Sequence, residues 1–137
     1  MWNTEAAVKY LNAHASPTSL GRCAEYTRLA IAAGGLALIH HVSAKDYGSS
    51  LTTLGFASFG QMTEGYLAGD VVVIDSIPGH PHGHMAMFNG ANWVSDFVQM
   101  HGLYPGPAYR SARPRYTIYR YTVLCDTVKP LASANFA

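Results

Sequence analysis

The spacing of hydrophobic positions changes near Gly69 and divides the chain into a helical first half and a second half of strands. Before this point, apolar residues recur every three or four positions, the period of a helix with one buried face. A first helix is expected to begin at Asn3 or Thr4, with Glu5 in its first turn, and to end at the Ser-Pro-Thr-Ser segment. The first half therefore predicts amphipathic helices.

A second helix is expected from Gly21 to Ala33, because two glycines follow it. Cys23 lies near its start and shares a face with Tyr26, Ala30 and Ile31 at helical spacing. A third and weaker helical pattern, with loop character, covers residues 43–60.

After Gly69 the pattern becomes that of strands. A β-branched run follows Gly69-Asp70 and predicts a central strand. Two further strands flank residues 89–91 as a hairpin, and a last strand follows the Pro- and Gly-rich segment 102–114. Helices followed by antiparallel strands predict an α+β fold, with the N-terminal helices packed on the sheet in a single domain over residues 1–137.

Composition and charge narrow the class of protein. The 137 residues are 49% hydrophobic and only 12% charged, which is typical of a globular domain and not of a disordered chain. A formal net charge of +1 argues against a nucleic-acid binder. The N-terminus lacks the features of a signal peptide, and the longest apolar run, residues 29–39, is too short for a membrane span.

The register of the hairpin decides which side chain faces His84. A three-residue loop at 89–91 places His84 opposite Asp96, where the carboxylate could hold one imidazole nitrogen and leave the other free as a base. A two-residue loop would instead place Ser95 opposite His84. We expect the three-residue loop.

Cys23 is the candidate nucleophile for such a base. The start of a helix favours a thiolate, and a thiol paired with histidine is the nucleophile of cysteine hydrolases. The alternative is that Cys23 is a small core residue. Cys125, in the predicted last strand, is expected to remain unbridged, because a catalytic thiolate cannot also be a disulfide sulfur.

Several motifs resemble the papain-like NlpC and CHAP clan of cysteine amidases. They are "GRCAEYTRLAI", "AGDVVVI" and "GHMAMFNG" followed by "WVSDF", in the order found in that clan, over residues 19–98. The resemblance implies a papain-like fold with Cys23 as nucleophile, His84 as base and Asp96 as the orienting residue. The chain departs from many members at Arg22, before the cysteine, and at the residues after it.

The resemblance also implies bacterial cell-wall chemistry without a cofactor. The expected substrate is an amide of the peptidoglycan stem peptide, either the D-alanyl–diaminopimelate crosslink, which we prefer, or the γ-D-glutamyl–diaminopimelate bond. The expected setting is a type VI secretion effector that acts in the periplasm of a target cell and has a periplasmic immunity protein. A phage-type CHAP lysin, a transferase of the same fold and an inactive binding module remain alternatives.

Other polar residues have weaker assignments. His80, His82 and His84 alternate, but Pro81 and Gly83 indicate a loop, so we expect no metal site. His82 is instead a substrate-binding candidate and a rival base. Tyr26 either lines the site or packs beside it. Four arginines form a cluster that either is solvated or meets carboxylates of the substrate: Arg110, Arg113, Arg115 and Arg120.

Overall fold

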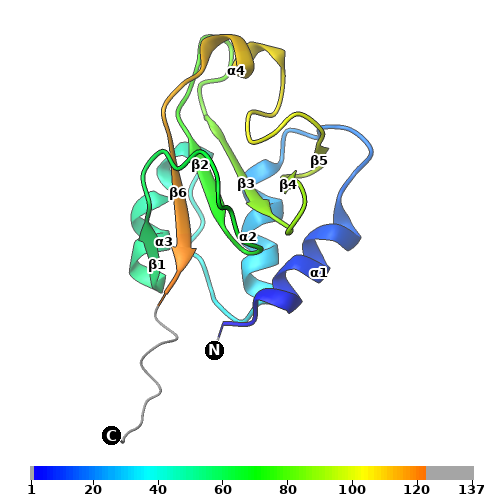
Figure 1. Cartoon of the computed structure of the whole chain (residues 1–137), viewed down its shortest axis with the longest axis vertical. Helices are drawn as coiled ribbons and strands as arrows, with labels where there is room; N and C mark the ends of the chain where they lie inside the picture. Colours follow the sequence, from blue (N-terminus) through cyan, green and yellow to red (C-terminus); the bar gives the residue numbers. More distant parts are fainter. Residues whose placement is uncertain (1, 123–137) are drawn as a thin grey trace, which may run out of the picture.

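Helices and antiparallel strands make up the part of the chain that the computed structural model describes, residues 2–122 (Figure 1). The helical elements are α1 (Thr4–His14), α2 (Cys23–Ala33), the 3-10 turn η1 (Ala44–Asp46), α3 (Gly48–Leu54) and α4 (Pro107–Ala112). The strands are β1 (Phe56–Ser58), β2 (Val71–Ile74), β3 (His84–Phe88), β4 (Trp93–Val94), β5 (Val98–Gln99) and β6 (Tyr116–Tyr121). The predicted α+β class is confirmed.

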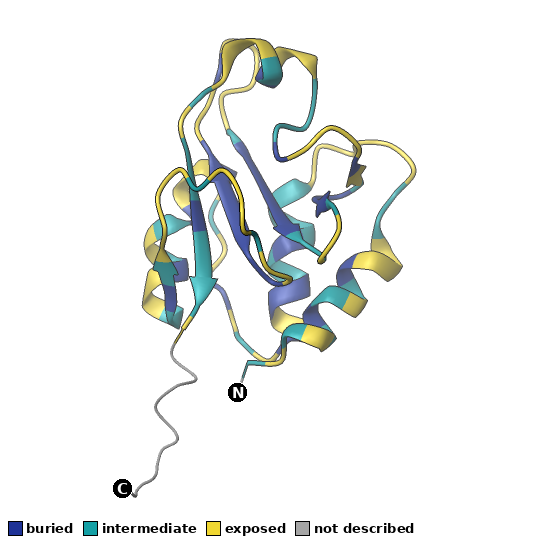
Figure 2. Ribbon diagram, viewed as in Figure 1, coloured by how far each residue is buried: buried dark blue, intermediate teal, exposed yellow. Residues whose placement is uncertain are grey.

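The strands form one sheet in the order β1-β6-β2-β3-β4-β5, and every neighbouring pair is antiparallel. β2 and β3 lie at its centre and are buried almost throughout (Figure 2). Successive side chains of a strand point to opposite faces. Val71 and Val73 therefore belong to one core cluster, and Val72 and Ile74 to the other.

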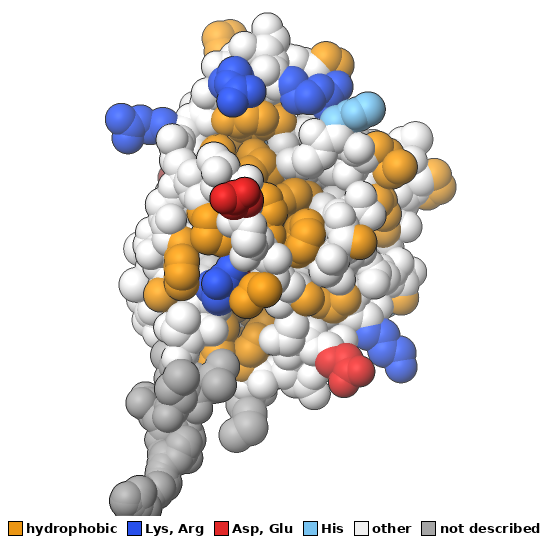
Figure 3. Space-filling view, viewed as in Figure 1, with side chains coloured by type: hydrophobic (Ala, Val, Ile, Leu, Met, Phe, Trp, Pro, Cys, Tyr) orange, Lys and Arg blue, Asp and Glu red, His pale blue; other side chains and the backbone are white. Residues whose placement is uncertain are grey.

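The two faces of the sheet are covered differently. Residues of α1, α2 and α3, including Leu11, Ile31 and Leu51, pack on one face. The other face is covered by the loops before β2 and after β5, through residues such as Tyr66 and Leu103. Figure 3 shows hydrophobic side chains gathered over the middle of the viewed face, where segment 59–70 crosses the sheet. Within residues 2–122, no helix combines the length and apolar character needed to cross a bilayer.

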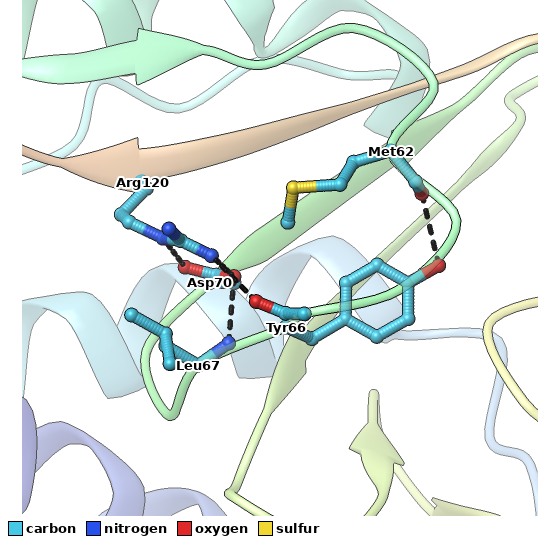
Figure 4. Close-up of polar contacts among 6 residues, drawn as sticks. Met62, Tyr66, Leu67, Asp70 and Arg120 are labelled. Atoms are coloured by element: carbon cyan, nitrogen blue, oxygen red, sulfur yellow. Dashed lines mark hydrogen bonds and ion pairs between the residues drawn. The ribbon is translucent and has the colours of Figure 1, made fainter.

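The Gly-Asp pair before β2 fixes the loop that crosses this face. Gly69 adopts φ +94°, and the carboxylate of Asp70 accepts hydrogen bonds from Nε and Nη2 of Arg120, both at 2.8 Å (Figure 4). It also accepts from the backbone N–H of Leu67 at 2.9 Å. Asp70 is buried and charged, so this pairing offsets its loss of hydration. Arg120 thus has a structural role within the arginine cluster.

Several predicted boundaries hold and others change. Asn3 caps α1 by accepting from the backbone N–H of Ala6, as expected. The weak helical pattern at 43–60 was too broad, because the structure divides it into η1, α3 and β1. The short helix α4 lies in a segment expected to be a loop. The described part of the last strand is β6, and residues 123–137 lie outside the described residues.

The predicted register of the hairpin was wrong. β3 pairs with β4 through Phe88 opposite Trp93, so the loop has four residues instead of three. The side chain of Asn89 explains the longer loop, because its Oδ1 accepts from the backbone N–H groups of Ala91 and Asn92. β4 then ends at Val94, and Asp96 lies in a second turn, which returns the chain into β5.

Candidate active site

Cys23 lies at the first residue of α2, beside a turn that Asp96 holds in place. Oδ2 of Asp96 accepts the backbone N–H of Leu20 at 2.7 Å and that of Arg22 at 2.9 Å. The chain therefore enters α2 through a fixed turn, although Asp96 is distant in sequence. The carboxylate near the helix start is also on the favourable side of the helix dipole.

A pocket of about 460 Å³ opens at this point and brings Cys23 and His84 together as lining residues. Its walls come from the start of α2, the loop before η1, the loop before β3, the turn between β4 and β5, and the start of α4. Such a concave site, with a thiol and an imidazole among mostly apolar surroundings, has the composition expected of an active site.

Gln99 holds the imidazole of His84. Nε2 of His84 lies 2.7 Å from Oε1 of Gln99, while Nε2 of Gln99 donates to the carbonyl oxygens of Gly102 and Leu103, each at 2.9 Å. Because both carbonyls need a donor, the amide oxygen must face the imidazole and accept its proton. Nε2 of His84 is therefore protonated, and Nδ1 remains as the free base.

The predicted hydrogen bond between His84 and Asp96 is thus absent, and Gln99 takes the orienting position. The cause is the second turn, since it moves Asp96 away from the face of β3 and brings β5 back alongside β4. Asp96 still acts on His84 through its charge, which raises the pKa of the imidazole. Its part in catalysis remains a prediction.

Burial keeps both candidate catalytic groups uncharged. Burial lowers the pKa of His84 to about 4, against the opposing effects of Gln99 and Asp96. Burial also raises the pKa of the Cys23 thiol to about 11, and the hydrogen bond from the Met85 backbone opposes this rise. Burial therefore opposes the thiolate expected at the helix start. It favours the neutral form of both the thiol and the imidazole that line the resting pocket.

The lowered pKa of His84 predicts an acid-sensitive fold. As pH falls from 6.5 toward 4, an unfolded chain takes up a proton at His84 that the folded chain does not bind. The free energy of unfolding should therefore fall across this window, by roughly 3 kcal/mol in total from this group. The measurement is urea unfolding of wild type and His84→Asn at about pH 7 and about pH 5. Between these two pH values, the free energy of unfolding of the wild type should fall by about 2 kcal/mol more than that of His84→Asn. An equal fall in both proteins would contradict the lowered pKa of His84.

The remaining candidates are arranged around the pocket. His80 and His82 line it, and Nδ1 of His82 lies 2.6 Å from Oγ of Ser43. Tyr26 is not a lining residue and instead packs against the guanidinium of Arg22, whose Cζ lies 5.5 Å from its ring centroid. Trp93 is buried in the core, whereas Phe97 is half-buried and lines the pocket.

Metal ligands, the second thiol and three arginines are the other features that the sequence singled out. In the described part of the chain, no three His, Cys, Asp or Glu side chains are grouped so that they could hold a metal ion. Cys125 lies outside the described residues, so its unbridged thiol stays a prediction. Within residues 2–122, Arg110, Arg113 and Arg115 form no ion pair.

Sequence reasoning missed Gln99 and Tyr109 as residues of the site. Gln99 follows Asp96 by three positions, so a prediction of the second turn would have brought it opposite β4. Tyr109 lies in the segment expected to be a loop, and its ring centroid is 6.0 Å from that of His84.

Comparison with known proteins relates the whole chain to solved structures. No family model and no curated protein matches the chain. Its fold alone is shared with Ly7917, solved with the hydrolysing product of MDP, at 15% identity and a TM-score of 0.52 over 86% of this chain and 63% of that one.

Two solved structures of the type VI effector–immunity complex Tae3–Tai3 from Ralstonia pickettii match much more closely. The native complex matches at 51% identity and a TM-score of 0.83, over 88% of this chain and 100% of the other. The selenomethionine complex matches at 53% identity and a TM-score of 0.78, over 83% and 98%. At this identity and coverage, the chain belongs to the Tae3 family of type VI effectors.

Proposed function

We propose that this effector is a cysteine-dependent peptidoglycan amidase of the papain-like NlpC and CHAP type. The observation that carries the proposal is the pocket shared by Cys23 and His84, in which Gln99 leaves Nδ1 of His84 free to act as a base. The membership in an effector family fits a reaction that damages a competing bacterium. Hydrolysis of an amide in the stem peptide would do so.

The neutral resting state determines the first step. Nδ1 of His84 takes the proton of the Cys23 thiol as the sulfur attacks the scissile carbonyl carbon, so the charged pair forms only during the reaction. A C–S bond forms, and the carbonyl π electrons move to the oxygen. We assign the stabilisation of that oxyanion to the backbone N–H of Cys23, at the start of α2.

His84 then completes the reaction. Its Nδ1–H protonates the leaving amine as the C–N bond breaks, and the peptide remains on Cys23 as a thioester. Water, deprotonated by Nδ1, attacks the thioester and releases a carboxylic acid and the free thiol. The negative charge of Asp96 favours the imidazolium that appears between these steps, which is the part in catalysis that we assign to it.

The surroundings of the pocket suit a substrate that carries carboxylates. His80 and His82 line its wall, and Arg110 follows Tyr109 in α4. Peptidoglycan stem peptides present the carboxylates of diaminopimelate and D-alanine, with which the Arg110 guanidinium would pair and to which the two imidazoles would donate hydrogen bonds. We assign His82 to substrate binding and favour the D-alanyl–diaminopimelate crosslink as the bond cut.

A protein inhibitor is the expected partner of such a pocket. The Ralstonia pickettii structures contain Tae3 bound to its immunity protein Tai3. We infer that the producing cell of this effector keeps a cognate immunity protein in its periplasm, and that the inhibitor covers the opening between Cys23 and His84.

The site of action gives a direct test in cells. A Sec leader fused to the wild type should cause lysis of a Gram-negative host, because the leader brings the enzyme to the peptidoglycan. The leader-free protein and a leader-bearing Cys23→Ala variant should both be harmless. Culture density and phase-contrast microscopy provide the measurement. Equal toxicity of the leader-bearing and leader-free proteins, or no lysis with either, would contradict the proposed function.

A further inference from the structure

The hydroxyl group of Tyr109 is buried at the pocket without a hydrogen-bond partner. In residues 2–122, the side-chain atoms in this condition are Nε of Arg28, Oδ1 of Asp96 and the hydroxyl of Tyr109. The last two belong to residues that line the pocket. A buried polar group without a partner destabilises a fold, so its presence at a reactive site calls for a functional reason.

Other tyrosines of the molecule show that such a partner is usually found. The hydroxyl of Tyr104, in the segment just before α4, donates to the carbonyl oxygen of Pro114 at 2.6 Å. The hydroxyls of Tyr66 and Tyr116 both donate to the carbonyl oxygen of Met62 at 2.9 Å. Each of these hydroxyls is paired with a backbone carbonyl oxygen, whereas that of Tyr109 is not.

The ring of Tyr109 lies near two imidazoles of the pocket, one of which is the proposed base. Its ring centroid lies 5.3 Å from that of His80 and 6.0 Å from that of His84. Burial, together with the nearby charge of a Cys23 thiolate, raises the pKa of Tyr109 to about 12. The phenol therefore keeps its proton throughout the pH range in which the enzyme would work, and it remains a hydrogen-bond donor in the pocket that Cys23 also lines.

We propose that the Tyr109 hydroxyl donates a hydrogen bond to the negative charge that develops on Cys23 when His84 takes the thiol proton. The inference rests on the proposed thiol chemistry and adds a catalytic donor to it. No proton leaves the phenol; the sulfur charge is stabilised while the C–S bond forms. Because the resting thiol is neutral, the hydroxyl has no acceptor until the reaction begins, which accounts for its unpaired state.

The test compares Tyr109→Phe with the wild type and with Tyr104→Phe as the matched control. Alkylation of Cys23 by iodoacetamide, followed across pH by mass spectrometry of the Cys23 peptide, reports the thiol pKa directly. We expect Tyr109→Phe to shift the alkylation profile upward by about one pH unit, with about a tenfold slower reaction near neutral pH. Tyr104→Phe should leave the profile unchanged.

Stability and turnover distinguish this role from a structural one. Tyr109→Phe should melt no lower than the wild type, because the removed hydroxyl has no partner, whereas Tyr104→Phe should melt lower. An unchanged alkylation profile in Tyr109→Phe overturns the proposal at any melting temperature. The alkylation readout needs no peptidoglycan, so a failure of the proposed amidase activity would be seen separately, as absence of muropeptide cleavage by the wild type.

Discussion

Replacement of Cys23 by alanine should abolish turnover and leave the fold intact. In this reaction scheme, the sulfur is the only protein atom that forms a bond to the substrate carbon, and loss of a nucleophile of this kind costs on the order of a thousandfold or more. The measurement is the initial rate of cleavage of purified crosslinked muropeptides, separated by chromatography. The change removes one half-buried atom, so circular dichroism and the melting temperature should stay close to those of the wild type.

Cys125→Ala is the matched control for the thiol. It removes the second cysteine of the chain and should retain full activity, because no step uses it. If Cys23→Ala keeps wild-type activity, the assignment of the nucleophile fails. If Cys125→Ala loses activity as well, a role for both thiols must replace the single-nucleophile scheme.

Gln99→Ala should reduce turnover by about a hundredfold or more, because it frees the imidazole whose tautomer and direction Gln99 sets. It also leaves Nε2–H of His84 and the carbonyl oxygens of Gly102 and Leu103 without their partner. The free energy of unfolding should fall by about 1–3 kcal/mol, measured by urea denaturation. The pH at half-maximal rate should change too, since Gln99 raises the pKa of His84.

The Asp96→Asn variant separates the orienting role of Gln99 from the electrostatic role of the Asp96 carboxylate. An asparagine oxygen can still accept the N–H groups of Leu20 and Arg22, so the turn before α2 should persist, while the charge is lost. We expect a loss of about tenfold, smaller than that of Gln99→Ala. A larger loss in Asp96→Asn than in Gln99→Ala would make Asp96 the orienting residue after all.

The sequence was sufficient for the elements whose residues carry a clear period or cap. Asn3 and Glu5 marked the start of α1, the two glycines after Ala33 marked the end of α2, and the β-branched run marked β2. These features depend only on residues close in the sequence, so they can be recognised without knowledge of the tertiary structure.

The partner of His84 could not be predicted in the same way. It depends on the length of the loop after Phe88, where the side chain of Asn89 stabilises four residues instead of three. It depends as well on the second turn at Asp96, inside a segment whose hydrophobic pattern suggested one continuous strand. A change of one residue in a turn reverses the face of every residue that follows.

The electrostatic state of Cys23 is a second property that local sequence did not determine. The helix start favours a thiolate, but the walls of the pocket, from His40 to Tyr109, come from segments distant in the chain. Their combined burial raises the pKa of the thiol instead. The balance between the helix terminus, which favours the thiolate, and burial, which disfavours it, therefore depends on long-range packing.

One measurement tests the central claim of amide hydrolysis most directly. Purified crosslinked muropeptides are incubated with the wild-type protein in water enriched in oxygen-18, and the products are analysed by mass spectrometry. The account predicts cleavage at a stem-peptide amide, with one heavy oxygen in the newly formed carboxyl group, since water releases the thioester from Cys23. Muropeptides that remain intact, or products whose new acyl end carries an amine in place of the heavy oxygen, would contradict it.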